Sequence, residues 1–154
     1  MYYQPYAIPR PVSVNWSFYR NDDMVLQLIE QSIQGERNDE LFYDFLIKLA
    51  PTSQEKEIIT GIRDDERKHR AMFRALYTQL TGKAPAVTEE ASEQLPSSYL
   101  AGIETALLGE LKAFEKYRTL YLHINPRYRD WIFEIMTDEM KHASYYNWLY
   151  AKNK

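Results

Sequence analysis

The sequence predicts an all-α protein, a four-helix bundle built from two antiparallel helix hairpins joined by a long crossover. Four stretches carry inward-facing side chains at helical spacing, and prolines or glycines separate them. The second half of the chain also repeats the pattern of the first. With 154 residues, of which 45% are hydrophobic, the chain is long enough to bury a core of this kind.

The first predicted hairpin comes from two helices separated by Pro51. One begins at Asp22, and the other begins near Ser53 and ends at Gly82, a residue type that commonly ends helices. The inward stripe of the first contains Ile29, Ile33, Glu36, Glu40, Tyr43 and Ile47. The stripe of the second contains Ile59, Ile62, Glu66, His69, Phe73, Leu76 and Leu80.

The second predicted hairpin follows a polar connection over residues 83–95. Pro96 suits the first turn of the third helix, and Asn125-Pro126 separates this helix from the fourth. The third stripe contains Ile103, Leu107, Glu110, Phe114, Tyr117, Tyr121 and Ile124. The fourth contains Tyr128, Ile132, Ile135, Glu139, His142, Tyr146 and Leu149.

The domain division is an N-terminal arm over residues 1–20 and the bundle over residues 21–154. The arm is rich in tyrosine and contains Pro5, Pro9 and Pro11, which exclude a regular helix. Two alternatives stay open: a disordered arm, or an extended strap whose aromatic rings dock on the bundle or on a partner.

Composition excludes several classes of function. A net charge of −3 without clustered lysine or arginine gives no face for nucleic acid. No apolar run reaches the roughly 20 residues that span a bilayer, and the N-terminus lacks the pattern of a signal peptide. We therefore expect a cytoplasmic protein that binds neither membrane nor nucleic acid. Because there are no cysteines, any metal must be held by carboxylate, imidazole, carbonyl or water.

An internal repeat is the most informative feature. The string "DDERKHRAMFRALY" at 64–77 aligns with "TDEMKHASYYNWLY" at 137–150, so both halves carry Asp-Glu-x-x-His. A further stripe glutamate, Glu36 or Glu110, stands 30 or 29 residues before the glutamate of each motif (66 − 36 and 139 − 110). The two halves are therefore expected to be copies of one hairpin, related by a pseudo-twofold axis.

The predicted metal ligands stand where their stripes call for apolar side chains. They are Glu36, Glu66, His69, Glu110, Glu139 and His142. Four buried carboxylates would repel one another, whereas two divalent cations would balance their charge. A Glu and a His at i and i+3 share a helix face, and this set matches a dinuclear carboxylate bundle site. The alternative, a solvated charge run on a helix surface, would explain one motif but not two in register.

The donor set indicates which metal is expected. Carboxylate with imidazole and no thiolate favours two iron ions, with manganese or zinc as alternatives. Asp65 and Asp138 are expected to fix the histidines by hydrogen bonds, on their own helix or across the bundle. Tyr43 and Tyr117 either bond the glutamates, take part in radical or electron transfer, or pack in the core with a satisfied hydroxyl, and core packing is favoured. For Glu40, an extra ligand, a proton shuttle and a carboxylate at the rim stay open, with the rim favoured.

These residues resemble the ferritin-like superfamily and, within it, the rubrerythrin-type di-iron carboxylate domain, over roughly residues 22–151. The resemblance rests on Glu36, on "DERKH" with Glu66 and His69, on Glu110, and on "DEMKH" with Glu139 and His142. It implies two irons, each with a terminal Glu and His, and bridging glutamates. Rubrerythrins add a cysteine-ligated rubredoxin module and a further glutamate three residues after the third-helix ligand. This chain has no cysteine and carries Ala113 at that position, and we expect no ferritin cage because no fifth helix follows.

The expected function is that of a non-haem di-iron oxidoreductase of peroxidase or ferroxidase type, which oxidises Fe(II) with hydrogen peroxide or dioxygen, or reduces these oxidants. No catalytic residue is predicted beyond the metal ligands, and an external electron donor is required. Iron sequestration and a structural, spore-coat-associated role with little turnover are the alternatives. The many aromatic side chains favour a homodimer.

Overall fold

The computed structural model describes residues 22–86 and 95–154, so the predicted arm at 1–20 lies outside the described residues. It contains four long helices, α1 (Asp22–Leu49), α2 (Ser53–Thr81), α3 (Tyr99–His123) and α4 (Arg129–Asn153), and a 3₁₀ turn, η2 (Pro126–Tyr128), before α4. Residues 22–86 and 95–154 form no strand. The predicted all-α four-helix bundle is confirmed.

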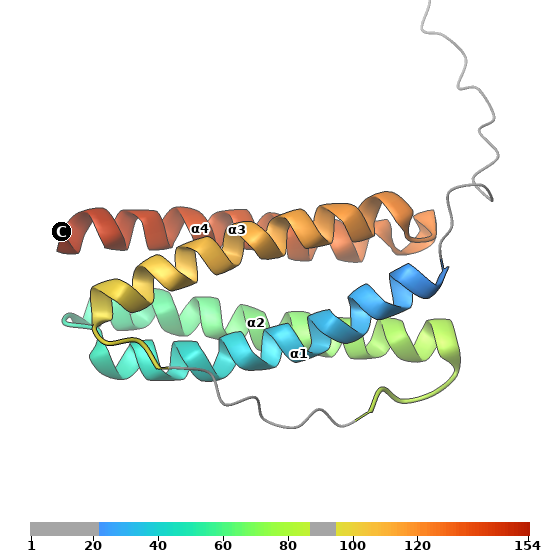
Figure 1. Cartoon of the computed structure of the whole chain (residues 1–154), viewed down its shortest axis with the longest axis horizontal. Coiled ribbons are helices and arrows are strands. Elements are labelled where there is room, and N and C mark those ends of the chain that lie inside the picture. Colours follow the sequence, from blue (N-terminus) through green and yellow to red (C-terminus); the bar gives the residue numbers. More distant parts are fainter. Residues whose placement is uncertain (1–21, 87–94) are drawn as a thin grey trace, which may run out of the picture.

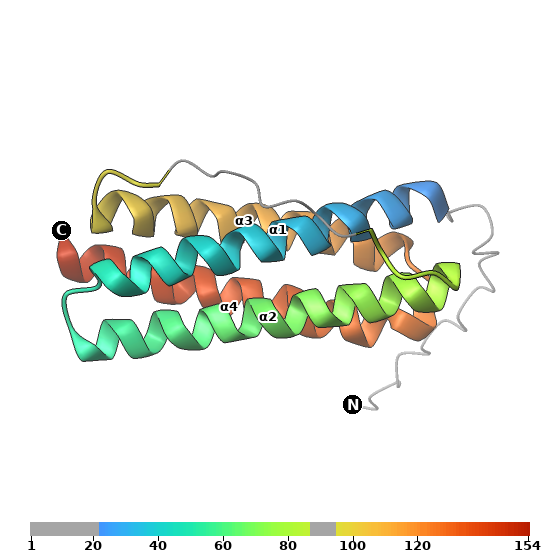
Figure 2. The ribbon, with the colours of Figure 1, turned by 90° about the horizontal axis from the view of Figure 1, so that it is seen from below.

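The helices form two hairpins, α1 with α2 and α3 with α4, which lie one against the other (Figure 1). Helix α2 ends at one end of the bundle and α3 begins at the other, so the connection between them must cover its length (Figure 1). Viewed from below, α1 and α2 lie in front of the second hairpin (Figure 2). Helices α1 and α3 therefore run antiparallel, and so do α2 and α4, which is the arrangement expected for a pseudo-twofold repeat.

Side chains and backbone geometry define the helix ends. The Thr52 hydroxyl accepts a hydrogen bond from the first turn of α2, and Gly82 ends that helix with a left-handed φ of 70°, which a residue without Cβ adopts at no steric cost. The Ser98 hydroxyl caps α3 in the same way. The third helix thus begins at Tyr99 rather than at Pro96, because a side-chain cap fixes its first turn.

Two apolar clusters fill the bundle, one toward each end. One contains Ile29, Ile33, Phe73, Leu76, Leu120 and Ile132, and the other contains Leu46, Ile59, Ile62, Ile103, Tyr146 and Leu149. The predicted metal ligands occupy the layer between them, so water is kept from the site on both sides. No helix among the described residues is long and apolar enough to cross a membrane.

Candidate metal centre

The six predicted ligands meet in the middle of the bundle. Each is at most 2% exposed. They form two groups whose ligand atoms lie within 4.8 Å of one another: Glu36, Glu66, His69 and Glu139 in the first, and Glu66, Glu110, Glu139 and His142 in the second. Glu66 and Glu139 belong to both groups, so the geometry offers two adjacent cation positions with two shared carboxylates.

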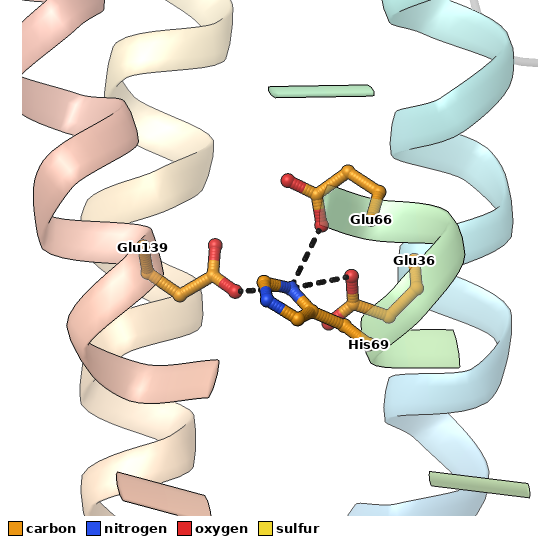
Figure 3. Close-up of side chains that lie close together, drawn as sticks. All are labelled: Glu36, Glu66, His69 and Glu139. Carbon is orange, nitrogen blue, oxygen red and sulfur yellow. Dashed lines mark ion pairs between the residues drawn. The ribbon is translucent and has the colours of Figure 1, made fainter. Parts of the chain in front are cut away.

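The first group joins three helices around His69 (Figure 3). Its Nδ1 atom lies 3.2 Å from Oε1 of Glu139, 3.5 Å from Oε2 of Glu66 and 3.6 Å from Oε2 of Glu36. Glu66 and His69 reach the same point because residues three apart share one face of α2. Glu36 comes from α1 and Glu139 from α4.

The second group repeats this arrangement around His142. Its Nδ1 atom lies 3.2 Å from Oε1 of Glu66, 3.6 Å from Oε2 of Glu110 and 3.8 Å from Oε2 of Glu139. The two imidazole rings lie with their centroids 6.0 Å apart and their planes 28° from parallel. The internal repeat of the sequence is therefore a repeat of the site in space.

The polar atoms at the centre test whether these residues fit a metal pair. Five buried atoms have no hydrogen-bond partner among the described residues: Oε2 of Glu36, Oε1 of Glu66, Nδ1 of His69, Oε1 of Glu139 and Nδ1 of His142. Buried polar groups without a partner cost free energy, and proteins seldom retain several together. All five are donor atoms that bind divalent cations, and all belong to the two groups. The residues fit two cations.

The charges of the metal-free centre also favour the binding of two cations. Burial raises the pKa of Glu66 well above its usual range, and the charges of Glu36 and Glu139 raise it further. Burial would lower the pKa of His69, but its contacts with these same three carboxylates outweigh that effect and raise the pKa to about 12. Without cations, protons must therefore neutralise the cluster.

The two aspartates of the repeated motif bond the histidines across the bundle. Nε2 of His142 lies 3.0 Å from Oδ2 of Asp65, and Nε2 of His69 lies 3.1 Å from Oδ2 of Asp138. Of the two arrangements left open by the sequence, the structure has the one that joins the hairpins. An Nε2–H donated to an aspartate leaves the Nδ1 lone pair facing the carboxylates.

The two predicted tyrosines bond glutamates on the facing helix. The Tyr43 hydroxyl donates to Oε1 of Glu110 over 2.6 Å, and the Tyr117 hydroxyl donates to Oε1 of Glu36. Each bond joins α1 to α3. On Glu36 this bond occupies Oε1 and leaves the unpartnered Oε2 for the centre.

Glu40 lies outside both groups, and its favoured interpretation as a carboxylate at the rim is wrong. It is only 5% exposed, and three arginines surround it: Arg67 Nε at 2.9 Å, Arg70 at 2.8 Å and Arg37 at 3.1 Å. Sequence reasoning missed this cluster, although its signal was present: Arg37 stands three residues before Glu40 on α1, and Arg67 and Arg70 stand three residues apart on α2.

Tyr146 was placed on the inward stripe of the fourth predicted helix, without a functional role. It is fully buried, its ring lies 5.4 Å from that of Tyr43, and its hydroxyl has no hydrogen-bond partner among the described residues. The repeat places Phe73 at the equivalent position of the first half. The two halves of the centre therefore differ by one hydroxyl group beside Tyr43.

Two comparisons with known proteins bear on this centre. Residues 27–100 match the family model for rubrerythrin. The chain is also 28% identical, over 115 residues, to the uncharacterized protein YhjR of Bacillus subtilis (strain 168), an alignment that covers 75% of this chain and 72% of that protein. The family match includes Glu36, Glu66 and His69, whereas the second half of the centre rests on the internal repeat and on the geometry described above.

Proposed function

On the premise that the chain is a rubrerythrin-type protein of the ferritin-like superfamily, we propose that it is a non-haem di-iron protein. It would oxidise Fe(II) with hydrogen peroxide or dioxygen, or reduce these oxidants. One observation carries the proposal: two buried ligand groups share Glu66 and Glu139 and contain five donor atoms without hydrogen bonds. Each iron would supply one electron, so the pair would supply two.

The ligand roles follow from the two groups. Glu36 and His69 would hold one ion, and Glu110 and His142 would hold the other. Glu66 and Glu139 would lie between the ions. Four carboxylates offset the charge of two divalent cations, so a buried centre of this kind needs no further counter-ion.

Iron is the metal that we propose among those the ligands accept. Carboxylate and imidazole donors suit iron, manganese and zinc, whereas copper(I) prefers sulfur donors, which this centre lacks. Iron and manganese would supply the electrons that the proposed reaction needs, and zinc would not. Rubrerythrin similarity favours iron over manganese.

The other side chains around the centre hold the ligands in place. Asp65 and Asp138 would keep each histidine with its proton on Nε2 and its lone pair toward the metal. Tyr43 and Tyr117 would fix the terminal glutamates by donating to the oxygen that faces away from the metal. The apolar clusters on both sides would limit access to small, uncharged molecules such as hydrogen peroxide and dioxygen.

An anaerobic Fe(II) titration of the full-length chain, followed by addition of peroxide or dioxygen, tests the proposal. We expect two irons per chain and oxidation well above the rate in buffer. The Glu66→Ala variant should lose both properties. Fewer than one iron per chain, or oxidation no faster than in buffer, would overturn the proposal, and many irons per chain would favour sequestration instead.

A cytoplasmic location and a homodimer belong to the same proposal. The apolar side chains exposed along α3 and α4 outside the α2–α4 surface support pairing of two copies: Leu108, Leu111, Leu122, Phe133 and Met140. Sedimentation of the full-length chain would test the dimer.

A further inference from the structure

A groove runs between α2 and α4 on the outside of the bundle. Its larger part has a volume of about 630 Å³ and is lined by Gln54, Ile58, Lys141, Ser144, Tyr145 and Trp148. An adjoining hollow of about 360 Å³ shares Ile58, Lys141 and Tyr145 with it and adds Glu57, Gly61, Ile62 and Asp65. We call these two hollows together the α2–α4 groove.

The repeat explains why the groove is open. The offset of 73 residues that relates Asp65 to Asp138 also relates Gly61 to Glu134 and Ile58 to Trp131. Glu134 pairs with a lysine of α2, Lys68, at 3.2 Å, and Trp131 packs on an apolar cluster. At Gly61 an added Cβ would meet no atom within 4 Å. Smaller side chains at these two positions leave one end of the α2–α4 surface open.

The groove reaches the outer side of the candidate metal centre. Asp65 lines it and accepts the hydrogen bond from Nε2 of His142. The opposite nitrogen of the same ring faces the shared glutamates, with Nδ1 at 3.2 Å from Glu66. A molecule held in the groove would therefore be separated from a metal ligand by a single carboxylate.

The lining indicates the chemistry of the occupant. Tyr145 and Trp148 are 43% and 44% exposed, although large aromatic side chains are usually more buried. Both face a hollow large enough for a fused ring system. Lys141 lines both hollows, is 47% exposed and pairs with Asp65 at 2.9 Å. The Lys152 ammonium, which pairs with Glu55 at 3.0 Å, lies 5.1 Å from the centre of the Trp148 ring. Stacking surfaces beside a cation suit a planar aromatic molecule with an anionic tail.

We propose that the α2–α4 groove binds a flavin nucleotide, which in its reduced form is the electron donor of the metal centre. This inference rests on the proposed function, which requires an external reductant. A two-electron carrier matches two metals that each change by one electron. Oxidation of one dihydroflavin to flavin releases two electrons and two protons. The electrons convert two Fe(III) to two Fe(II), and the protons leave to solvent at the open groove.

Quenching of flavin fluorescence measures the binding of oxidised flavin mononucleotide to the full-length chain. This test of the site requires no turnover. We expect saturable binding that weakens about tenfold in Trp148→Ala, because the stacking surface is lost, and in Gly61→Phe, because the new ring fills the groove. Riboflavin, which lacks the phosphate, should bind more weakly than the nucleotide.

Matched controls separate this site from general effects. Phe133→Ala removes a ring of similar exposure from the same helix, and Gly109→Phe fills open space at a helical glycine of α3 that lies outside the groove. Both should bind flavin within about twofold of the wild-type chain. Equal binding by all four variants, or no saturable binding, would overturn the inference.

A second measurement tests electron delivery. Reduced flavin should convert the ferric protein to the ferrous form about tenfold more slowly in Gly61→Phe, whereas dithionite should reduce both proteins at similar rates. Equal rates with reduced flavin would overturn the donor role. A chain that takes up two irons but no flavin would overturn this inference alone, and a chain that binds flavin but no iron would overturn the proposed function.

Discussion

Nε2 of His142 on α4 lies 3.0 Å from Oδ2 of Asp65 on α2, so a residue of one Asp-Glu-x-x-His motif fixes the histidine of the other. Asp138 does the same for His69 at 3.1 Å. The hydrogen bond from His142 lowers the pKa of Asp65 far below its usual range, with a further contribution from Lys141. The aspartate therefore stays ionised, and the two motifs depend on each other for the orientation of their ligands.

Asp65→Asn should weaken metal binding by about tenfold or more, because the amide removes the negative charge that orients His142. Asp138→Asn should weaken metal binding in the same way, because it removes the charge that orients His69. Titration of the metal-free protein with Co(II), followed by its visible absorption, measures the affinity. Asp64→Asn is the control, since Asp64 bonds Arg63 and not a ligand. An equal loss in that variant would contradict the assigned role.

Metal counting should separate shared from terminal glutamates. Glu36 belongs to one ligand group and Glu66 to both. Glu36→Gln should therefore keep one tightly bound metal per chain, and Glu66→Gln should lose both, as measured by elemental analysis after gel filtration. Equal stoichiometry in the two variants would contradict the shared position of Glu66.

Metal uptake should release protons and weaken as the pH falls. Burial and neighbouring carboxylates raise the pKa of Glu66 and of Glu110, and contacts with carboxylates raise that of His69 to about 12. These groups hold protons in the metal-free state and must lose them when a cation binds. A pH-indicator dye in weakly buffered solution measures the release. Uptake without proton release would contradict this description of the metal-free centre.

Glu55 should make stability depend on pH at the end of the bundle. Burial alone would raise its pKa, but hydrogen bonds from Tyr99, Lys152, Asn153 and Thr52 outweigh it and lower the pKa below 4.5. A depressed pKa stabilises the fold above pH 4.5, and this contribution is lost as the pH falls through the folded-state value.

Glu55→Gln should therefore lower the free energy of unfolding by about 1 to 3 kcal/mol at neutral pH, and by less at acid pH. Urea unfolding at several pH values checks this. Glu57→Gln, an exposed neighbour on the same helix, should change little. A constant difference between Glu55→Gln and wild type at every pH would count against the explanation.

Tyr146→Phe should leave the stability unchanged or raise it by about 1 kcal/mol, because the buried hydroxyl has no hydrogen-bond partner among the described residues. Tyr117→Phe should lower it, because the hydroxyl of Tyr117 donates to Glu36. Thermal unfolding of the metal-free variants measures both. A large loss in Tyr146→Phe would indicate a bond to that hydroxyl.

The fold and the convergence of the six ligands followed from sequence because both depend on periodicity. Glutamates and histidines on inward stripes must meet in the interior of the bundle. The repeat indicated that the ligands of the second hairpin face those of the first. The choice between own-helix and cross-bundle bonds for Asp65 depended on how α2 and α4 pack, which spacing along one helix does not give. Residues 1–20 lie outside the described residues, so the role of the arm stays a prediction.

Other features were missed because they arise between elements. Arg67 lies within a motif and is 44% exposed, and it also bonds Glu40 on the neighbouring helix, a contact that spacing along α2 does not give. The α2–α4 groove results from Ile58 and Gly61, which are smaller than Trp131 and Glu134 at the equivalent positions of the repeat and lie opposite Tyr145. Such pairings require the separation and rotation of two helices, which a hydrophobic pattern does not determine.

The anomalous scattering of iron in crystals of the Fe(II)-loaded, full-length chain tests whether the bundle holds a pair of irons. Two peaks per chain are predicted in the middle of the bundle, one beside Nδ1 of His69 and one beside Nδ1 of His142, with oxygens of Glu66 and Glu139 contacting both. A bundle interior without an iron peak, or iron bound only at surface carboxylates, would contradict the proposed di-iron centre.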